Sequence, residues 1–150
     1  MSELRVRLVK DDERSALLEL YEHLHEEDIA LPEEAALANA WKEFTEERSL
    51  FCFVGEFDGL LASSCVLSVV PNLTRACRPY GLIENVVSRR QFRRRGFAKA
   101  VLERALDFAK EKGCYKVMLL SGRREEGVRR FYESCGFDPD SKQAFVQKLF

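Results

Sequence analysis

The segment Val86–Ala98 has the residue types and spacing that a phosphate-binding turn requires, because it joins an apolar run to a helical pattern. The first turn of a helix has main-chain N–H groups without intrahelical partners, and the helix dipole adds positive potential there. Gly96 and Ala98 lack bulk, so that a phosphate could approach the main chain closely. Three consecutive arginines add positive charge: Arg93, Arg94 and Arg95. A basic loop closed by a glycine, with hydrated arginines, fits the same residues.

Other nucleotide-binding motifs do not match this turn. It lacks the Gly-Lys-Ser/Thr ending of a P-loop, and it lacks the first two glycines of the dinucleotide-binding fingerprint. The formal net charge of -1 and the absence of aromatic residues interleaved as a stacking platform also speak against nucleic-acid binding through residues 89–95.

Four elements are expected before the turn in the first 70 residues. Alternation over Leu4–Val9 predicts a strand, and Asp11 or Asp12 offers an N-cap for a helix over residues 12–23. A second helix should open at Pro32-Glu33, with Ala36, Leu37, Ala40, Trp41 and Phe44 on one face. Two strands, at residues 50–57 and 60–70, should form a hairpin around Asp58-Gly59.

The rest of the chain predicts a strand at residues 80–88, a helix at 95–112, a strand at 115–120, a helix at 125–134 and a last strand at 143–149. Gly113 and Gly136 should close the two helices. This order indicates an α/β (α+β) fold with a mixed, mostly antiparallel sheet and helices on both faces. No repeat or linker interrupts it, so that we expect a single domain over residues 1–150.

Composition narrows the cellular setting. The longest apolar runs are too short to span a bilayer, and the first residues show no basic-then-apolar leader, so that we expect no membrane association. The five cysteines are odd in number and form no CxxC pair, which disfavours a disulfide framework or a zinc site. We therefore expect no metal and a reducing, cytoplasmic location. Residues 1–50 hold fourteen Asp and Glu against six Lys and Arg, which favours a cationic partner or a hydrated acidic surface.

Two motifs resemble the GNAT acetyltransferase family. Arg93-Arg94-Arg95-Gly96-Phe97-Ala98 matches the family's Arg/Gln-x-x-Gly-x-Gly/Ala signature, and residues 131–137 match its later Phe-Tyr-x-x-x-Gly-Phe motif. The opening strand and helix also resemble the start of the family, so that the resemblance covers nearly the whole chain. Residues 81–87 and 113–117 are similar to the glucosamine-6-phosphate acetyltransferases, although Asn85 and Glu125 stand where the family has an acidic residue and an asparagine.

The resemblance implies that acetyl-CoA is the co-substrate. Main-chain amides of the signature turn would bind the pyrophosphate of coenzyme A, while the arm of the cofactor would pair with the backbones of Val86 and Val87. The side chains of both valines should pack in the core. The residues of the turn carried over from the family are Arg93, Arg94, Arg95, Gly96, Ala98 and Lys99.

The resemblance also suggests two catalytic side chains for direct attack of an amine on the thioester. Tyr132 would protonate the leaving sulfur, although a core tyrosine would fit the same position. Glu84 would take the proton of the amine, directly or through water, although a structural glutamate is the alternative. His23 and His25, at the end of the first helix, are further possible bases.

The acceptor stays open at this level. A small-molecule or peptide amine is expected: a lysine or N-terminal amine, a polyamine, an aminosugar or an antibiotic. Similar proteins are often dimers, so that a homodimer is possible. The competing hypothesis is a non-catalytic acyl-CoA-binding or sensing module of the same fold, which the presence of Tyr132 and Glu84 disfavours.

Overall fold

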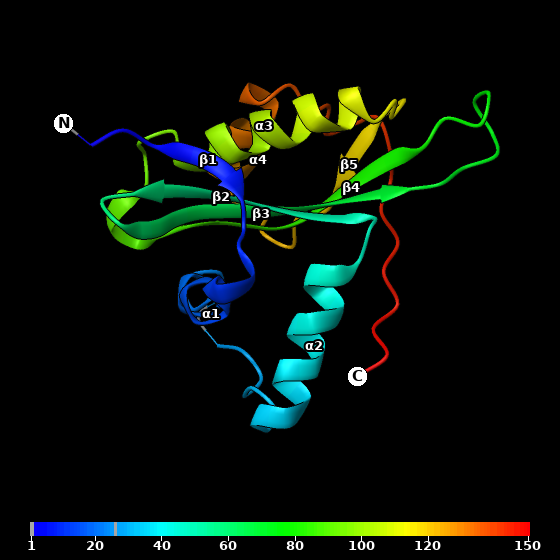
Figure 1. Cartoon of the computed structure of the whole chain (residues 1–150). Helices are drawn as coiled ribbons and strands as arrows, with labels where there is room; N and C mark the ends of the chain where they lie inside the picture. The colour runs from blue at the N-terminus through cyan, green and yellow to red at the C-terminus, as the bar shows by residue number, and fades with distance from the viewer. Residues whose placement is uncertain (1, 26) are drawn as a thin grey trace. The chain divides into compact units, whose positions relative to one another are not determined.

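A five-stranded sheet with the order β1-β2-β3-β4-β5 organises the fold (Figure 1). The computed structural model describes residues 2–25 and 27–150, and the chain divides after Met118 into two compact units. The strands are β1 (Arg5–Leu8), β2 (Leu50–Phe57), β3 (Leu60–Val70), β4 (Tyr80–Ser88) and β5 (Val117–Leu119). The sequence predicted β2, β3 and β4 with these bounds.

The first four strands form an antiparallel meander. Asp58 and Gly59 turn the β2–β3 hairpin with positive φ values of 52° and 73°, as a two-residue turn that follows the twist of its strands requires. β5 follows β4 through a helix. The N–H of Tyr115 donates to the carbonyl of Pro79 and the N–H of Gly81 to that of Lys116, which makes these strands parallel.

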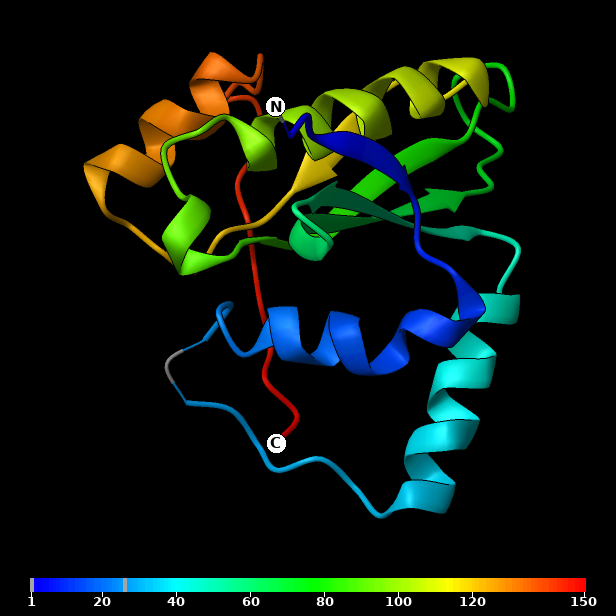
Figure 2. The ribbon, with the colours of Figure 1, turned by 60° about the vertical axis from the view of Figure 1, so that its left-hand side comes forward.

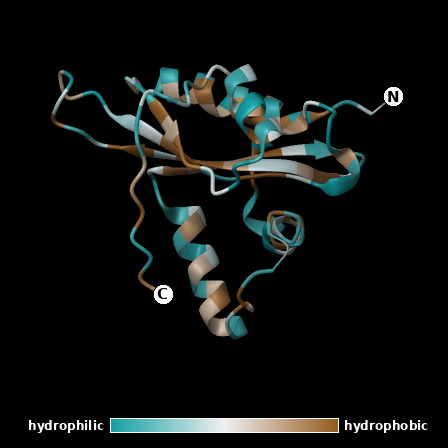
Figure 3. Cartoon of the chain, turned by 180° about the vertical axis from the view of Figure 1, so that it is seen from behind, coloured by the Kyte–Doolittle hydropathy of each residue, from teal (hydrophilic) through white to brown (hydrophobic). Residues whose placement is uncertain are grey.

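Helices lie on both faces of the sheet, as predicted (Figure 2). On one face lie a short 3-10 helix, η1 (Asp11–Glu13), and the helices α1 (Arg14–Tyr21) and α2 (Glu34–Glu46); on the other lies α3 (Phe97–Glu111). Beneath α1, Leu17 and Leu20 pack on buried residues of the strands, namely Cys52, Val54, Leu61, Val66 and Val87. The apolar side chains of α3 are buried on the opposite face, and Figure 3 shows the brown central strands between these layers.

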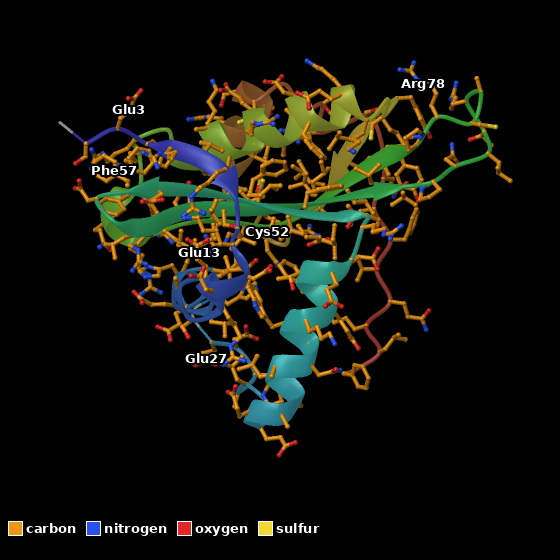
Figure 4. The ribbon with its side chains drawn as sticks, in the orientation of Figure 1. Glu3, Glu13, Glu27, Cys52, Phe57 and Arg78 are labelled. Atoms are coloured by element: carbon orange, nitrogen blue, oxygen red, sulfur yellow. The ribbon has the colours of Figure 1, made fainter. Side chains whose placement is uncertain are left out.

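The start of the first helix differs from the prediction. Neither Asp11 nor Asp12 caps it with a side-chain hydrogen bond. Instead the carboxylate of Glu13 accepts the N–H of Lys10 at 2.8 Å, and the same carboxylate pairs with Arg7 of β1 at 2.6 Å (Figure 4 labels Glu13). Because the arginine comes from a strand, a local N-cap rule cannot anticipate this arrangement.

The two cysteines of the sheet are buried. Burial raises the pKa of Cys52 to about 11 and that of Cys65 to about 12, so that both remain neutral thiols near pH 7. Cys77, on the connection between β3 and β4, is exposed. Among residues 2–25 and 27–150, no helix is long and apolar enough to cross a membrane.

The second unit, which begins at Leu119, contains α4 (Glu126–Ser134) and an extended tail. Gly136 has a φ of 92° and ends α4, while the N–H of Phe137 donates back to the carbonyl of Tyr132. The predicted strand at residues 143–149 is wrong, because these residues form no strand. Their apolar residues have no pairing strand in the described chain, and Phe145 and Leu149 are exposed.

Candidate active site

A β-bulge interrupts β4 in its second half. Val66 of β3 lies opposite Glu84 and Ser64 lies opposite Val87, so that two residues of β4, Asn85 and Val86, face a single residue of β3. Asn85 adopts a φ of 54°, which asparagine tolerates better than most residues. A bulge bends its strand and frees main-chain groups from the ladder, and bulges are frequent next to active sites.

Among the strands of the described residues, none pairs with the part of β4 beyond the bulge on the side of β5. The parallel register with β5 starts at Gly81 and Lys116, and β5 is only three residues long. β4 continues to Ser88, so that Val86 and the residues after it extend past the end of β5. The side chain of Val87 is buried in the core beneath α1, as predicted, whereas that of Val86 is only partly buried. Main-chain groups here can pair with an extended amide chain.

The segment after β4 forms a turn rich in free donors. A 3-10 helix, η2 (Arg90–Phe92), leads into Arg94 and Gly96, whose φ values of 63° and 78° are positive, while the φ of Arg95 between them is negative. Such an alternation makes successive N–H groups converge, as in anion-binding nests. Within the described chain, none of the main-chain N–H groups of residues 94–99 donates a hydrogen bond. The free donors at the N-terminus of α3 therefore have the arrangement that an anion requires.

The three arginines of the turn have different surroundings. The guanidinium of Arg95 lies over a cluster of aromatic rings: Phe57 at 4.5 Å, Phe97 at 5.0 Å and Phe92 at 5.7 Å from the ring centroids. Arg93 donates to the carbonyl of His23 at 3.3 Å, and Arg94 is exposed. Arg95 thus helps to pack the turn, and Arg94 is the arginine whose charge is least engaged.

Arg89 anchors the turn, a role that sequence reasoning did not single out. Its side chain is buried and its Nε donates to the carbonyl of Leu61, while its N–H donates to that of Ala62. The same guanidinium pairs with Glu19 of α1 at 2.8 Å. Nothing local distinguishes Arg89 from its basic neighbours in the sequence, because its partners lie on β3 and α1.

His23 also contacts the turn. Its Nδ1 accepts the main-chain N–H of Arg90 at 3.1 Å. Burial lowers the pKa of His23, and the nearby charges of Arg89, Arg90 and Arg93 lower it further, so that the neutral ring is favoured. His25, the other histidine considered as a base, is exposed.

Glu84 lies on the same face of the sheet as α1. It is opposite Val66, whose side chain belongs to the core beneath α1, and directly opposite residues of antiparallel strands point to the same face. The side chain of Glu84 is exposed, and it makes no hydrogen bond or ion pair with the described residues. It is therefore accessible to a molecule that approaches this face.

A buried hydroxyl lies close to the bulge. The hydroxyl of Tyr21, at the end of α1, is enclosed without a hydrogen-bond partner at normal distance among the described residues, and it faces Cys52 and Asn85. Burial raises the pKa of Tyr21 strongly, so that it stays protonated.

Tyr132 belongs to the second unit. It lies near the end of α4, is partly buried, and contacts the rings of Phe131 and Phe137 edge-on, with centroids 5.1 and 6.1 Å away. These contacts fix the ring of Tyr132 within its own unit.

The fold is that of known acetyltransferases. A structure from Agrobacterium tumefaciens str. C58, provisionally described as an acetyltransferase, matches with a TM-score of 0.88 and 38% identity over 96% of this chain and 99% of that one. The glucosamine-6-phosphate N-acetyltransferase of Arabidopsis thaliana matches with a TM-score of 0.82 and 25% identity over 99% of both chains.

The sequence comparisons define the family. The pattern of the acetyltransferase (GNAT) family matches residues 15–137. A glucosamine 6-phosphate N-acetyltransferase of Trypanosoma brucei brucei is 31% identical over 142 residues, which are 94% of this chain and 93% of the relative. The chain belongs to the GNAT family and is an acetyl-CoA-dependent N-acetyltransferase, as the sequence motifs predicted.

Proposed function

We propose that residues 86–99 bind acetyl-CoA and that the acetyl group passes to the amine of a small molecule. The observation that carries this proposal is the group of unpaired main-chain N–H donors at residues 94–99, directly after the bulged strand β4. These donors suit the pyrophosphate of coenzyme A, with added charge from Arg93, Arg94 and Lys99. The backbones of Val86 and Val87 would pair with the amides of its arm.

When bound, acetyl-CoA supplies a thioester that an amine can attack directly. The fit of this chain to the cofactor rests on Gly96. Its positive φ shapes the turn, and the space beside its Cα is open, because a Cβ added there would meet no atom within 4 Å. Holding the amine and the thioester together would contribute several kcal/mol, up to ~10 kcal/mol, to the rate.

Glu84 is the proposed general base. An amine arrives largely protonated and has to lose a proton before it attacks the carbonyl carbon. The carboxylate of Glu84 is exposed and unpaired in the described chain, on the face of the sheet that carries α1 and α2 (Figure 1). It would take that proton, directly or through a water molecule.

Tyr132 is the proposed general acid. When the bond between the acetyl carbon and sulfur breaks, the electron pair remains on sulfur, and the phenol would donate its proton there. The support is its place in the Phe131-Tyr132 pair of the family motif and the rigid packing of its ring.

The proposed acceptor is a cationic small molecule, with an aminosugar as the first candidate. The segment between α1 and α2 exposes Glu22, Glu27, Asp28 and Glu33, which would attract a protonated amine. The relative from Trypanosoma is named for glucosamine 6-phosphate, and Asn85 in place of an acidic residue distinguishes this chain from the usual pattern. A polyamine or a peptide amine is the alternative.

Acetyl-CoA turnover with a panel of amines tests the proposal. The panel holds glucosamine, glucosamine 6-phosphate, spermidine, an aminoglycoside and a lysine peptide, and thiol release is followed in parallel with calorimetric binding of acetyl-CoA. Acetylation of an aminosugar above the other amines would support the proposed acceptor. Tight binding without turnover of any amine would favour the non-catalytic module instead.

We also propose a homodimer. Its support is the tail of the second unit, where Phe145, Val146, Leu149 and Phe150 expose large apolar side chains that a second copy of the chain could cover. Light scattering after size-exclusion chromatography would give twice the 17.3 kDa monomer mass if the proposal holds and the monomer mass if it does not.

A further inference from the structure

The end of α1 is connected to the cofactor turn by hydrogen bonds that cross the sequence (Figure 2 shows both segments). The Nδ1 atom of His23 accepts the N–H of Arg90, 67 residues away, at 3.1 Å. The carbonyl of the same histidine accepts the side chain of Arg93 at 3.3 Å. His23 therefore contacts the turn both at the start of η2 and just after its end.

Between these points the main chain of the turn makes few hydrogen bonds, although the ring of Phe92 packs against Phe57 and Phe97. Within η2, the N–H of Phe92 donates to the carbonyl of Arg89 at 2.9 Å, but the N–H of Arg93 is 3.4 Å from the carbonyl of Arg90. Arg89 is fixed by β3 and α1, whereas the N–H of Arg90 has His23 as its partner. The imidazole therefore fixes the main chain at Arg90, while the aromatic cluster holds the side chains of Phe92 and Arg95.

The hydrogen bond from the N–H of Arg90 determines which protonation form of the His23 ring can hold the turn. A ring nitrogen that accepts a hydrogen bond is unprotonated, so that the neutral tautomer carries its proton on Nε2. In the imidazolium form both nitrogens are donors, and Nδ1–H would oppose the N–H of Arg90. Three charged groups of the turn act on the ring, namely Arg89, Arg90 and Arg93, and Glu22 acts on it from the end of α1. The carboxylate of Glu19 is paired with Arg89.

We propose that His23 is a positioning residue that holds the cofactor turn in its anion-binding conformation, and that protonation of its ring releases the turn. This inference rests on the proposed cofactor site. Because protonation of His23 releases the turn, the affinity for coenzyme A falls as the pH falls. The added positive charge of an imidazolium does not compensate, because it is one more charge beside several arginines, whereas the lost acceptor leaves two donors face to face.

Three variants separate this role from a general structural one. His23→Ala removes the acceptor, and His23→Asn keeps an oxygen acceptor near the position of Nδ1 but cannot be protonated. His25→Asn is the matched control, because His25 is exposed two residues further on. Thermal melts of all three variants check that the fold is retained.

The measurement is the Kd of coenzyme A by calorimetry from pH 5.5 to 8. At pH 8 we expect His23→Ala to bind about five- to tenfold more weakly than the wild type, the effect of about one hydrogen bond, with kcat at saturation little changed. His23→Asn should bind like the wild type at pH 8. The wild type should lose affinity relative to His23→Asn as the pH falls, while His25→Asn should follow the wild type throughout.

Two outcomes would overturn the proposal: a constant ratio of wild-type to His23→Asn affinity over this pH range, or wild-type affinity in His23→Ala at pH 8. An NMR measurement on the protein without coenzyme A separates a wrong role for His23 from a wrong cofactor site. The amide resonance of Arg90 should titrate with His23 in the wild type and not in His23→Asn. Titration of that amide in a protein that binds no coenzyme A would refute the cofactor site alone, and an amide that does not titrate would refute the role of His23.

Discussion

The guanidinium of Arg95 lies over the ring of Phe57, with 4.5 Å between the Cζ atom and the ring centroid. Phe57 ends β2, at the hairpin end of the sheet (Figure 4), and Arg95 immediately precedes the N-cap of α3. The contact joins the turn before α3 to the β2–β3 hairpin. The sequence indicates Arg95 for its charge, whereas in the structure its guanidinium packs on the aromatic cluster. This packing contributes to the stability of the fold.

The arginines of the turn should therefore separate into two kinds. Arg95→Gln should lower the free energy of unfolding by about 1 kcal/mol, because the cation–π contacts with the aromatic rings are lost. Arg94→Gln, at an exposed position, should leave the melting temperature unchanged and weaken coenzyme A binding, with a smaller dependence on salt. Urea unfolding and calorimetry measure the two effects. Equal losses of stability in both variants would contradict this division.

Gly96→Glu should abolish binding of acetyl-CoA. The variant places a carboxylate at the donors of residues 94–99, and like charges that close cost several kcal/mol, about 100-fold or more in affinity. Gly113→Glu is the matched control, since Gly113 ends the same helix with a φ of 81° against 78° and also has open space around it. Both variants bear the same backbone strain of about 1–2 kcal/mol. Unchanged affinity in a folded Gly96→Glu variant would show that the site is elsewhere.

Tyr132→Phe should lower kcat about 100-fold with little change in the Kd of acetyl-CoA, because the hydroxyl acts on the leaving sulfur while the ring keeps its packing. The measurement requires an acceptor slow enough for chemistry to limit the rate. Phe131→Leu, which alters the neighbouring ring and leaves the hydroxyl, is the control for packing. A kcat at the wild-type level would restrict Tyr132 to a packing role.

Glu84→Gln should lower kcat/KM most near neutral pH, where the amine is protonated and needs a base. At high pH the free amine is already abundant, so that the variant should approach the wild type. Glu103→Gln, at an exposed position on α3, is the control. The measurement is the ratio of kcat/KM of Glu84→Gln to that of the wild type across pH 6.5–9.5. A ratio that does not change with pH, together with a lower melting temperature, would identify a structural carboxylate.

The pairing of Glu13 with Arg7 should make stability depend on acid pH. The hydrogen bond from Arg7 lowers the pKa of Glu13 in the folded state, and the same arginine lowers that of Glu56. A carboxylate with a depressed folded-state pKa stabilises the fold above its unfolded pKa near ~4.3, and this contribution is lost as the pH falls through the folded value. The wild type should therefore exceed Glu13→Gln in unfolding free energy at pH 7, with the difference shrinking below about pH 4. Glu3→Gln, at an exposed position, should show no such change.

The strands were predictable because their determinants are local. Runs rich in Phe and Val are bounded by Asp58-Gly59 and by Pro71, and these turn residues mark the ends of β2 and β3 in the sequence. The turn at Gly96 was predictable for the same reason. The tail at residues 143–149 shows the limit of this reasoning, since a segment with apolar residues forms a strand only where another strand pairs with it.

The rest of the site depends on contacts between distant segments. The extra residue at Asn85 becomes visible only when β4 is aligned with β3, and Arg89 differs from its basic neighbours only through bonds to β3 and α1. The sequence suggests His23 as a base from its type and its place at the end of the first helix, whereas its ring accepts a main-chain N–H. No pattern within a short window of sequence contains these relationships.

The order of the strands in the sheet is also their order in the chain. Consecutive strands from β2 to β4 need only a two-residue turn or a short loop to meet, which keeps the contact order of the meander low and favours rapid folding. During synthesis, each strand of the sheet emerges from the ribosome after the neighbour with which it pairs. The sheet can therefore grow by one strand at a time, from β1 to β5, without waiting for a later segment to be inserted between strands already paired.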